Sequence, residues 1–193
     1  PLTESKKIID MGYAADLTDE IKSRGLYDKI NSFTMDLISK DGHIYYLPQE
    51  TYDQGIIVNV ELYKKAGYVD ADGNLYQPKT WEDLAEVAKK IKETTGVDGF
   101  AIPTTDNCGG WRFMPIAWGY GTQFETQQSD GSWKATFNSP ECVKALQYLK
   151  DLKWKHKVMP EKTLLSNANV QEQFAAGNVA MTIAEANTVN NIV

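Results

Sequence analysis

The chain has 193 residues, of which 42% are hydrophobic and 24% are charged, close to the average for globular proteins. Its formal net charge of −6 argues against nucleic acid or anionic lipid as a partner. It holds no signal peptide, lipidation motif or run of 18 or more apolar residues, and because it starts at Pro1 we expect a piece of a longer protein.

Residues 1–40 predict short helices without obvious chemistry. Thr18 is expected to cap a helix that ends at Gly25, and Phe33, Leu37 and Ile38 share one face at helical spacing. The acidic residues of this part are most simply a solvated helix surface.

Residues 41–59 form the stretch around which the chain is organised. Asp41-Gly42 predicts a turn, residues 44–47 a strand closed by Pro48, and residues 55–58 a strand buried on both faces. Residues 49–54 between them are polar and carry an aromatic ring at Tyr52. We expect this connector to pass from one lobe to another along the floor of a cleft.

The next segment holds a possible metal loop. Asn59 can cap a helix over residues 60–66, and alternating acidic and amide side chains follow from Asp70 to Asn74. A calcium loop would need Gly at its sixth and Glu at its twelfth position, where this chain has Leu75 and Trp81. We therefore predict an ordinary turn and no metal site.

The clearest helix is predicted from Thr80, its N-cap, to Gly96, and a short buried strand follows at residues 99–102. Residues 103–112 are predicted to be a loop, ahead of an aromatic helix over residues 113–118. Ligands collect beyond the carboxyl ends of strands in open α/β sheets. Small residues beside Trp111 would leave its ring approachable, although the ring could also pack in the core.

After the aromatic helix the pattern predicts a hairpin over residues 124–137. A helix capped by Ser139 follows, and its inner face is predicted to consist of Cys142, Leu146, Leu149 and Leu152. The lysines late in that helix suit the negative end of its dipole better than a nucleic-acid patch. A short helix over residues 170–176 and a strand over residues 179–183 follow. Glu185 and Asn187 then form a third polar loop beyond a strand end.

Cys108 and Cys142 leave one disulfide possible, although two small, reduced side chains are the simpler interpretation. With only His43 and His156 in the chain, a zinc site would need carboxylate ligands, and no spacing suggests one. Neither a metal nor another cofactor is predicted.

Several short motifs follow one another in an order that a known family shares. The first four are Asp41-Gly42-His43-Ile44-Tyr45 before Pro48, Ile56-Ile57-Val58-Asn59, Lys64-Lys65-Ala66-Gly67 and Pro78-Lys79-Thr80-Trp81-Glu82-Asp83. The last three are Gly96-Val97-Asp98-Gly99-Phe100-Ala101, Ser139-Pro140-Glu141 and Phe174-Ala175-Ala176-Gly177-Asn178-Val179-Ala180-Met181. In this order the chain resembles the extracellular solute-binding proteins of bacterial ABC importers, in particular the carbohydrate-binding family that includes maltose-binding protein.

The resemblance implies an α/β, periplasmic-binding-protein-like (type II) fold with two lobes, of which this chain is a part. Residues 1–51 would end the N-terminal lobe and residues 52–193 would form most of the C-terminal lobe, with the first crossover near residues 49–55. It also implies a receptor without enzymatic activity that closes on a mono- or oligosaccharide and passes it to membrane permease subunits. Such a protein would be extracellular, either a membrane-anchored lipoprotein or periplasmic.

The resemblance also places the ligand contacts. Tyr52 and Asp53 fall on the first crossover, and Trp111 falls where a family member carries a stacking aromatic, with Asp106 and Arg112 in the same loop. Glu185 and Asn187 fall after the last strand. There Asn187 replaces a stacking tryptophan, which implies a ligand smaller than a maltodextrin or one held by more polar contacts. An aromatic face beside carboxylates and amides suits a sugar ring.

Two other functions fit the same residues. A glycosidase would use two carboxylates about 5 to 10 Å apart, chosen among Glu50, Asp53, Asp106 and Glu185, one of them with a raised pKa; a Cys108–histidine pair lacks a third group. An adhesion or sensor module on the same fold is the third possibility. Residues 1–51 without the rest of their lobe would expose apolar faces, so we expect this piece to be partly disordered, rearranged or self-associated.

Overall fold

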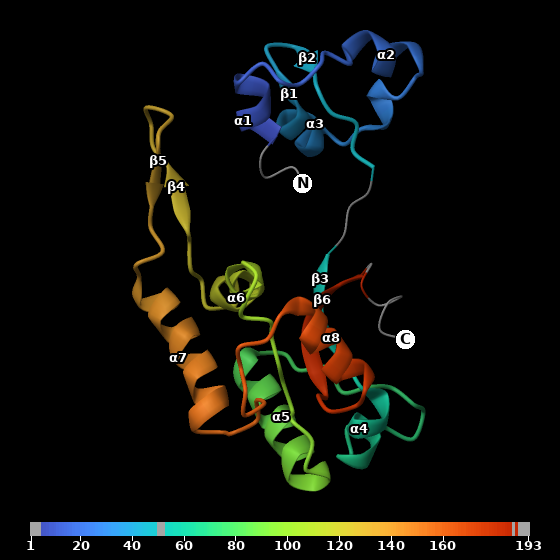
Figure 1. The fold of residues 1–193 in the computed structure, drawn as a ribbon, viewed down its shortest axis with the longest axis vertical. Helices are drawn as coiled ribbons and strands as arrows, with labels where there is room; N and C mark the ends of the chain where they lie inside the picture. Colours follow the sequence, from blue (N-terminus) through green and yellow to red (C-terminus); the bar gives the residue numbers. More distant parts are fainter. Residues whose placement is uncertain (1–4, 50–52, 187, 189–193) are drawn as a thin grey trace. The chain divides into compact units, whose positions relative to one another are not determined.

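The computed structural model describes residues 5–49, 53–186 and 188. The chain divides into two compact units, Pro1–Thr51 and Tyr52–Val193, which are described separately (Figure 1).

The first unit is a small helical cluster with one short hairpin. Its core consists of Ile21, Ile38 and Ile44, which are 3% exposed or less. Its elements are α1 (Ser5–Asp10), α2 (Thr18–Ser23), the 3-10 turn η2 (Tyr27–Lys29), α3 (Ser32–Ile38), β1 (Ser39–Lys40) and β2 (His43–Ile44).

The predicted turn at Asp41-Gly42 is confirmed, because both residues have positive φ and join the antiparallel strands β1 and β2. The strand predicted over residues 44–47 is wrong in extent, since β2 ends at Ile44. The cap at Thr18 is also wrong. Thr18 is the first residue of α2, and its hydroxyl instead donates to Asp16 and accepts from the amide of Ile44.

The second unit packs helices against a small sheet (Figure 1). Its elements are β3 (Gln54–Val58), α4 (Val60–Lys65), α5 (Trp81–Thr95), α6 (Cys108–Gly119), β4 (Glu125–Gln127), β5 (Trp133–Ala135), α7 (Pro140–Trp154), α8 (Asn167–Ala175) and β6 (Met181–Glu185).

The sheet of this unit is built around β6. β3 pairs with β6 in antiparallel fashion, with Gln54 opposite Glu185 and Val58 opposite Met181. The predicted strand at residues 99–102 is present as a buried segment that bridges to β6 in parallel at Ala101, though without a continuous ladder. Gly99 lets this segment approach α5, because a Cβ there would lie 2.4 Å from the carbonyl oxygen of Ala88.

The prediction that β3 is buried on both faces is wrong. Gly55 and Ile56 are exposed, Ile56 by 38%, whereas the first four residues of β6 are buried. Within the described residues β3 has a ladder partner on one side, so it is an edge strand of this sheet.

Most helix boundaries agree with the capping residues in the sequence. The side chains of Asn59, Thr80 and Ser139 accept hydrogen bonds from the first turns of α4, α5 and α7, and Gly96 ends α5 with positive φ. The helix predicted from Val170 instead starts at Asn167, because Ser166 and Asn169 form a capping box.

The inner face of α7 was predicted only in part. Cys142 and Leu152 are buried as expected, but Leu146 is 54% exposed and lies on the outer face. Ala145 and Tyr148 take the inner positions instead. A run of leucines at roughly helical spacing does not by itself say which of two adjacent faces is inside.

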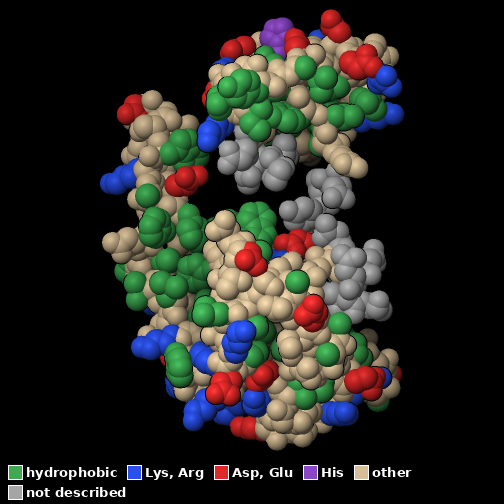
Figure 2. Space-filling model, viewed as in Figure 1, with side chains coloured by type: hydrophobic (Ala, Val, Ile, Leu, Met, Phe, Trp, Pro, Cys, Tyr) green, Lys and Arg blue, Asp and Glu red, His purple; other side chains and the backbone are tan. Residues whose placement is uncertain are grey.

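The predicted hairpin is confirmed as β4 and β5, and large apolar side chains are exposed around it (Figure 2). They include Trp133, Phe137 and Val143. Both cysteines are free thiols, so the disulfide that the sequence allowed is not formed. In the described parts of the chain no helix is long and apolar enough to cross a bilayer.

Candidate functional site

Three segments of the second unit meet at the carboxyl end of β6. They are the first turns of α6, the start of α8 and the residues that follow Ile183. Because β6 and the segment at residues 98–102 run parallel, the chain that leaves each of them emerges at the same edge of the sheet. The structure thus brings together Trp111, Arg112 and Glu185, three of the predicted site residues.

Arg112, which is buried, and Glu185, which is partly buried, form an ion pair with two parallel hydrogen bonds. Nη1 and Nη2 of Arg112 each donate to a carboxylate oxygen of Glu185 at 2.6 Å. The side chains are only 2% and 14% exposed. A parallel pair of charge-assisted hydrogen bonds in this setting fixes both side chains in one geometry.

The indole of Trp111 is hydrogen-bonded to the same carboxylate. Its Nε1–H donates to Oε1 of Glu185 at 3.1 Å, while the residue remains 39% exposed. The alternative that this ring packs in the core is therefore wrong. An aromatic ring held by its polar edge with part of its surface open can receive a flat, apolar ligand face.

Two further residues complete the cluster, and the sequence analysis did not predict either of them as a site residue. Asn167 Oδ1 accepts from Nη2 of Arg112 at 3.2 Å, and Thr188 Oγ1 donates to Oε2 of Glu185 at 3.3 Å. The capping box at Ser166 could have located Asn167 at a helix start. No sequence signal pointed to Thr188.

The charge state of the cluster follows from its contacts. Burial by itself raises the pKa of the Glu185 carboxyl, but hydrogen bonds from Arg112, from its own backbone and from Trp111, with the charge of Arg112, hold that pKa below its usual range. Glu185 is thus ionised at neutral pH, and the Arg112–Glu185 pair carries no net charge. Among the described residues Arg112 Nε has no hydrogen-bond partner.

The other predicted site residues lie at the margin of the cluster or outside the residues that the structure describes. The carbonyl of Asp53 accepts from the amide of Ala186 at 3.2 Å, and the residue is exposed. Asp106 is exposed, with positive φ, just before α6. Tyr52 and Asn187 lie outside the described residues.

The loop predicted over residues 103–112 is wrong in extent, because α6 already begins at Cys108. Gly109 and Gly110 therefore lie in the first helical turn. A Cβ at Gly109 would lie 3.2 Å from the carbonyl oxygen of Thr104, so glycine lets the start of α6 pack closely against the backbone of Thr104. Trp111 and Arg112 are consequently carried by a helix and not by a loop.

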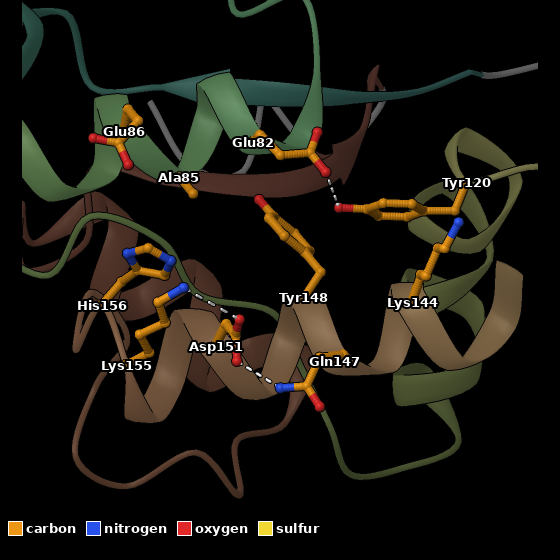
Figure 3. Close-up of a pocket in the computed structure, with 10 residues that line it drawn as sticks. All are labelled: Glu82, Ala85, Glu86, Tyr120, Lys144, Gln147, Tyr148, Asp151, Lys155 and His156. Carbon is orange, nitrogen blue, oxygen red and sulfur yellow. Dashed lines mark hydrogen bonds and ion pairs between the residues drawn. The ribbon is translucent and has the colours of Figure 1, made fainter. Parts of the chain in front are cut away.

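A separate pocket of about 440 Å³ lies between α5 and α7, and Trp111, Arg112 and Glu185 are not among its lining residues (Figure 3). Glu82 accepts from the Tyr120 hydroxyl at 2.6 Å, and Asp151 accepts from Gln147 at 2.6 Å. Tyr148 points its hydroxyl toward α5, and burial raises the pKa of that hydroxyl. None of the predicted site residues that the structure describes lines this pocket, whereas three of them meet in the Trp111 cluster, which is therefore the candidate site.

Nothing in the described cluster resembles a metal centre. Across the described residues no three His, Cys, Asp or Glu side chains gather as ligands would. What the cluster offers is a fixed, partly open indole beside an ion pair that carries no net charge and in which both terminal nitrogens of Arg112 are hydrogen-bonded. That arrangement suits binding by stacking and hydrogen bonding.

Comparisons with known proteins find relatives among bacterial solute-binding proteins. A family model described as bacterial extracellular solute-binding protein matches residues 3–192. The arabinooligosaccharide-binding protein of Bacillus subtilis (strain 168) is 30% identical over 138 residues, which cover 72% of this chain and 29% of that protein. The sn-glycerol-3-phosphate-binding periplasmic protein UgpB of Escherichia coli (strain K12) is 29% identical over 160 residues, 80% of this chain and 34% of that protein.

Among solved structures, the maltose-bound MalE3 of T. maritima matches with a TM-score of 0.75 and 28% identity, over 89% of this chain and 42% of that one. The chain therefore spans about a third of the length of the curated relatives and less than half of this solved structure.

Proposed function

The chain belongs to the bacterial extracellular solute-binding protein family, and from this premise we propose that it captures a neutral carbohydrate for an ABC importer. The ligand would be a mono- or oligosaccharide, released to membrane permease subunits. The observation that carries the proposal is the indole of Trp111, which is 39% exposed and donates through Nε1 to the partly buried carboxylate of Glu185.

The charge of the cluster supports a neutral ligand over an anionic one. The relatives include one named for arabinooligosaccharide and one named for sn-glycerol 3-phosphate. A phosphate ester would be bound best by an unpaired guanidinium or ammonium group. In the described cluster both terminal nitrogens of Arg112 are bound to Glu185, and the nearby Asp53 and Asp106 are acidic.

Residues 1–51 are assigned to the end of the N-terminal lobe and residues 52–193 to most of the C-terminal lobe. The division of the chain into compact units at residue 51 supports this assignment. Tyr52, Asp53, Asp106 and Asn187 are proposed as additional ligand contacts. Binding between two lobes would use contacts that both lobes supply only when closed.

The proposal gives the protein no catalytic role. A glycosidase needs one carboxyl group with a raised pKa, and the pKa of Glu185 is instead lowered. We further propose that the protein is held at the outer face of the cytoplasmic membrane by a lipid anchor or is free in the periplasm. An adhesion module on the same fold is the remaining alternative.

A panel of sugars tests these functions together. We expect a carbohydrate to raise the melting temperature of the protein and change its tryptophan fluorescence while the sugar is recovered unchanged. Release of reducing sugar that stops when Glu185 or Asp53 is replaced would support a glycosidase. A protein that responds to no sugar in the panel would be better explained as an adhesion module.

A further inference from the structure

The carboxylate of Glu185 is fully occupied inside the protein. An ionised carboxylate offers about four acceptor positions. Oε1 accepts from Nη1 of Arg112 and Nε1 of Trp111, and Oε2 accepts from Nη2 of Arg112 and the hydroxyl of Thr188. A sugar hydroxyl could bind to Glu185 only by displacing one of these donors.

We infer that Glu185 is a positioning residue, which sets the plane of the Trp111 ring for the ligand and does not itself contact the ligand. That the ligand is a sugar rests on the proposed function, but the hydrogen bonds that orient the ring do not depend on that proposal. Arg112, 2% exposed and bound at both terminal nitrogens, prevents the carboxylate from turning. Glu185 in turn holds the indole by its one polar atom.

The chain of contacts starts in the sheet. Glu185 is the last residue of β6, and its cross-strand partner Gln54 fixes the end of that strand to β3. Trp111 and Arg112 are adjacent residues near the start of α6. The carboxylate therefore joins the sheet to the helix that carries the ring, and the orientation of the indole depends on both.

A helical tryptophan without such a partner could turn about its side-chain bonds and would lose that freedom on stacking. Ordering a side chain on binding costs free energy. The indole of Trp111 is ordered beforehand by its bond to Glu185. Trp118, on the same helix and 54% exposed, makes no hydrogen bond through its indole nitrogen within the described residues and serves as the comparison.

The first test needs no ligand. In an NMR spectrum with ¹⁵N-labelled indoles, Trp111→Phe identifies the Trp111 signal among the five tryptophans. Glu185→Gln should shift that signal and speed its exchange with water, while the Trp118 signal stays in place. An unmoved Trp111 signal would overturn the inference, and movement of all the signals would indicate a merely structural role and overturn it equally.

The second test is a double-mutant cycle on sugar affinity. Glu185→Gln should weaken binding by about threefold or more in the natural background, but by less than about twofold when residue 111 is already phenylalanine. Additive losses would mean that Glu185 contacts the ligand directly and would overturn the inference. If the protein binds no sugar at all, the proposed function fails, while the indole spectrum still decides the role of Glu185.

Glu185→Gln leaves Arg112 without a full counter-charge in a buried place, so its folding needs a check by circular dichroism. Where that variant does not fold, Arg112→Lys replaces it. Lysine keeps a cation beside Glu185 but lacks the planar fork, so the carboxylate gains freedom to turn. The Trp111 signal should again shift, and a signal identical to the natural one would contradict the inference.

Discussion

At the scale of single residues, Trp111 and Glu185 have different parts in the same cluster. Trp111 is 39% exposed and presents a ring surface, whereas the Glu185 side chain is 14% exposed and has its acceptor positions filled by Arg112, Trp111 and Thr188. The ring is the group that a ligand can reach. The carboxylate orients the ring through its hydrogen bond to the indole nitrogen.

Trp111→Ala is expected to weaken sugar binding by about 1 to 3 kcal/mol, or about 5- to 150-fold in Kd, because it removes the stacking surface. Trp118→Ala is the matched control, since Trp118 is an equally large, exposed ring on the same helix. Fluorescence titration of both variants measures the difference. Equal affinity of the Trp111 variant and the natural protein would remove this ring from the site.

The sequence predicted the members of this cluster better than their arrangement. Trp111, Arg112 and Glu185 were identified because they follow strand ends or resemble family positions. The ion pair between Arg112 and Glu185 could not be read from residues 73 positions apart, because only the fold brings them together. Thr188 lies only three residues after Glu185, but no sequence signal marked its side chain as part of the cluster.

At the scale of elements, local signals located helix starts well and burial poorly. Asn59, Thr80 and Ser139 cap helices because a side-chain oxygen and its amide partner are only three residues apart in sequence. The exposure of β3 depends on whether a second strand lies beside it. No pattern within residues 54–58 carries that information, so their apolar run was wrongly read as fully buried.

The two faces of α7 provide a stability prediction. Leu152→Ala should lower the free energy of unfolding by about 2–5 kcal/mol, because Leu152 is fully buried in the main core and its removal leaves a cavity. Leu146→Ala on the same helix should change it by less than about 0.5 kcal/mol, since Leu146 is 54% exposed. Urea denaturation of the two variants measures both values, and equal losses would contradict the assignment of the inner face.

At the scale of the whole molecule, the predicted fold class and family are confirmed. The family model covers residues 3–192, and the solved maltose-bound relative at 28% identity superposes with a TM-score of 0.75. The motifs that carried the resemblance were turns and helix caps, which explains why they identify the fold and not the ligand. Ligand choice depends on side chains from segments that are remote in sequence, and this remains a proposal.

The central claim is that the protein reversibly binds a neutral sugar at the Trp111 cluster. Isothermal titration calorimetry with arabinooligosaccharides, maltooligosaccharides and sn-glycerol 3-phosphate tests it most directly. We predict saturable heat from at least one of the neutral sugars, lost or weakened in Trp111→Ala, and none from the phosphate ester. Saturable binding of sn-glycerol 3-phosphate without binding of either sugar series would contradict the account.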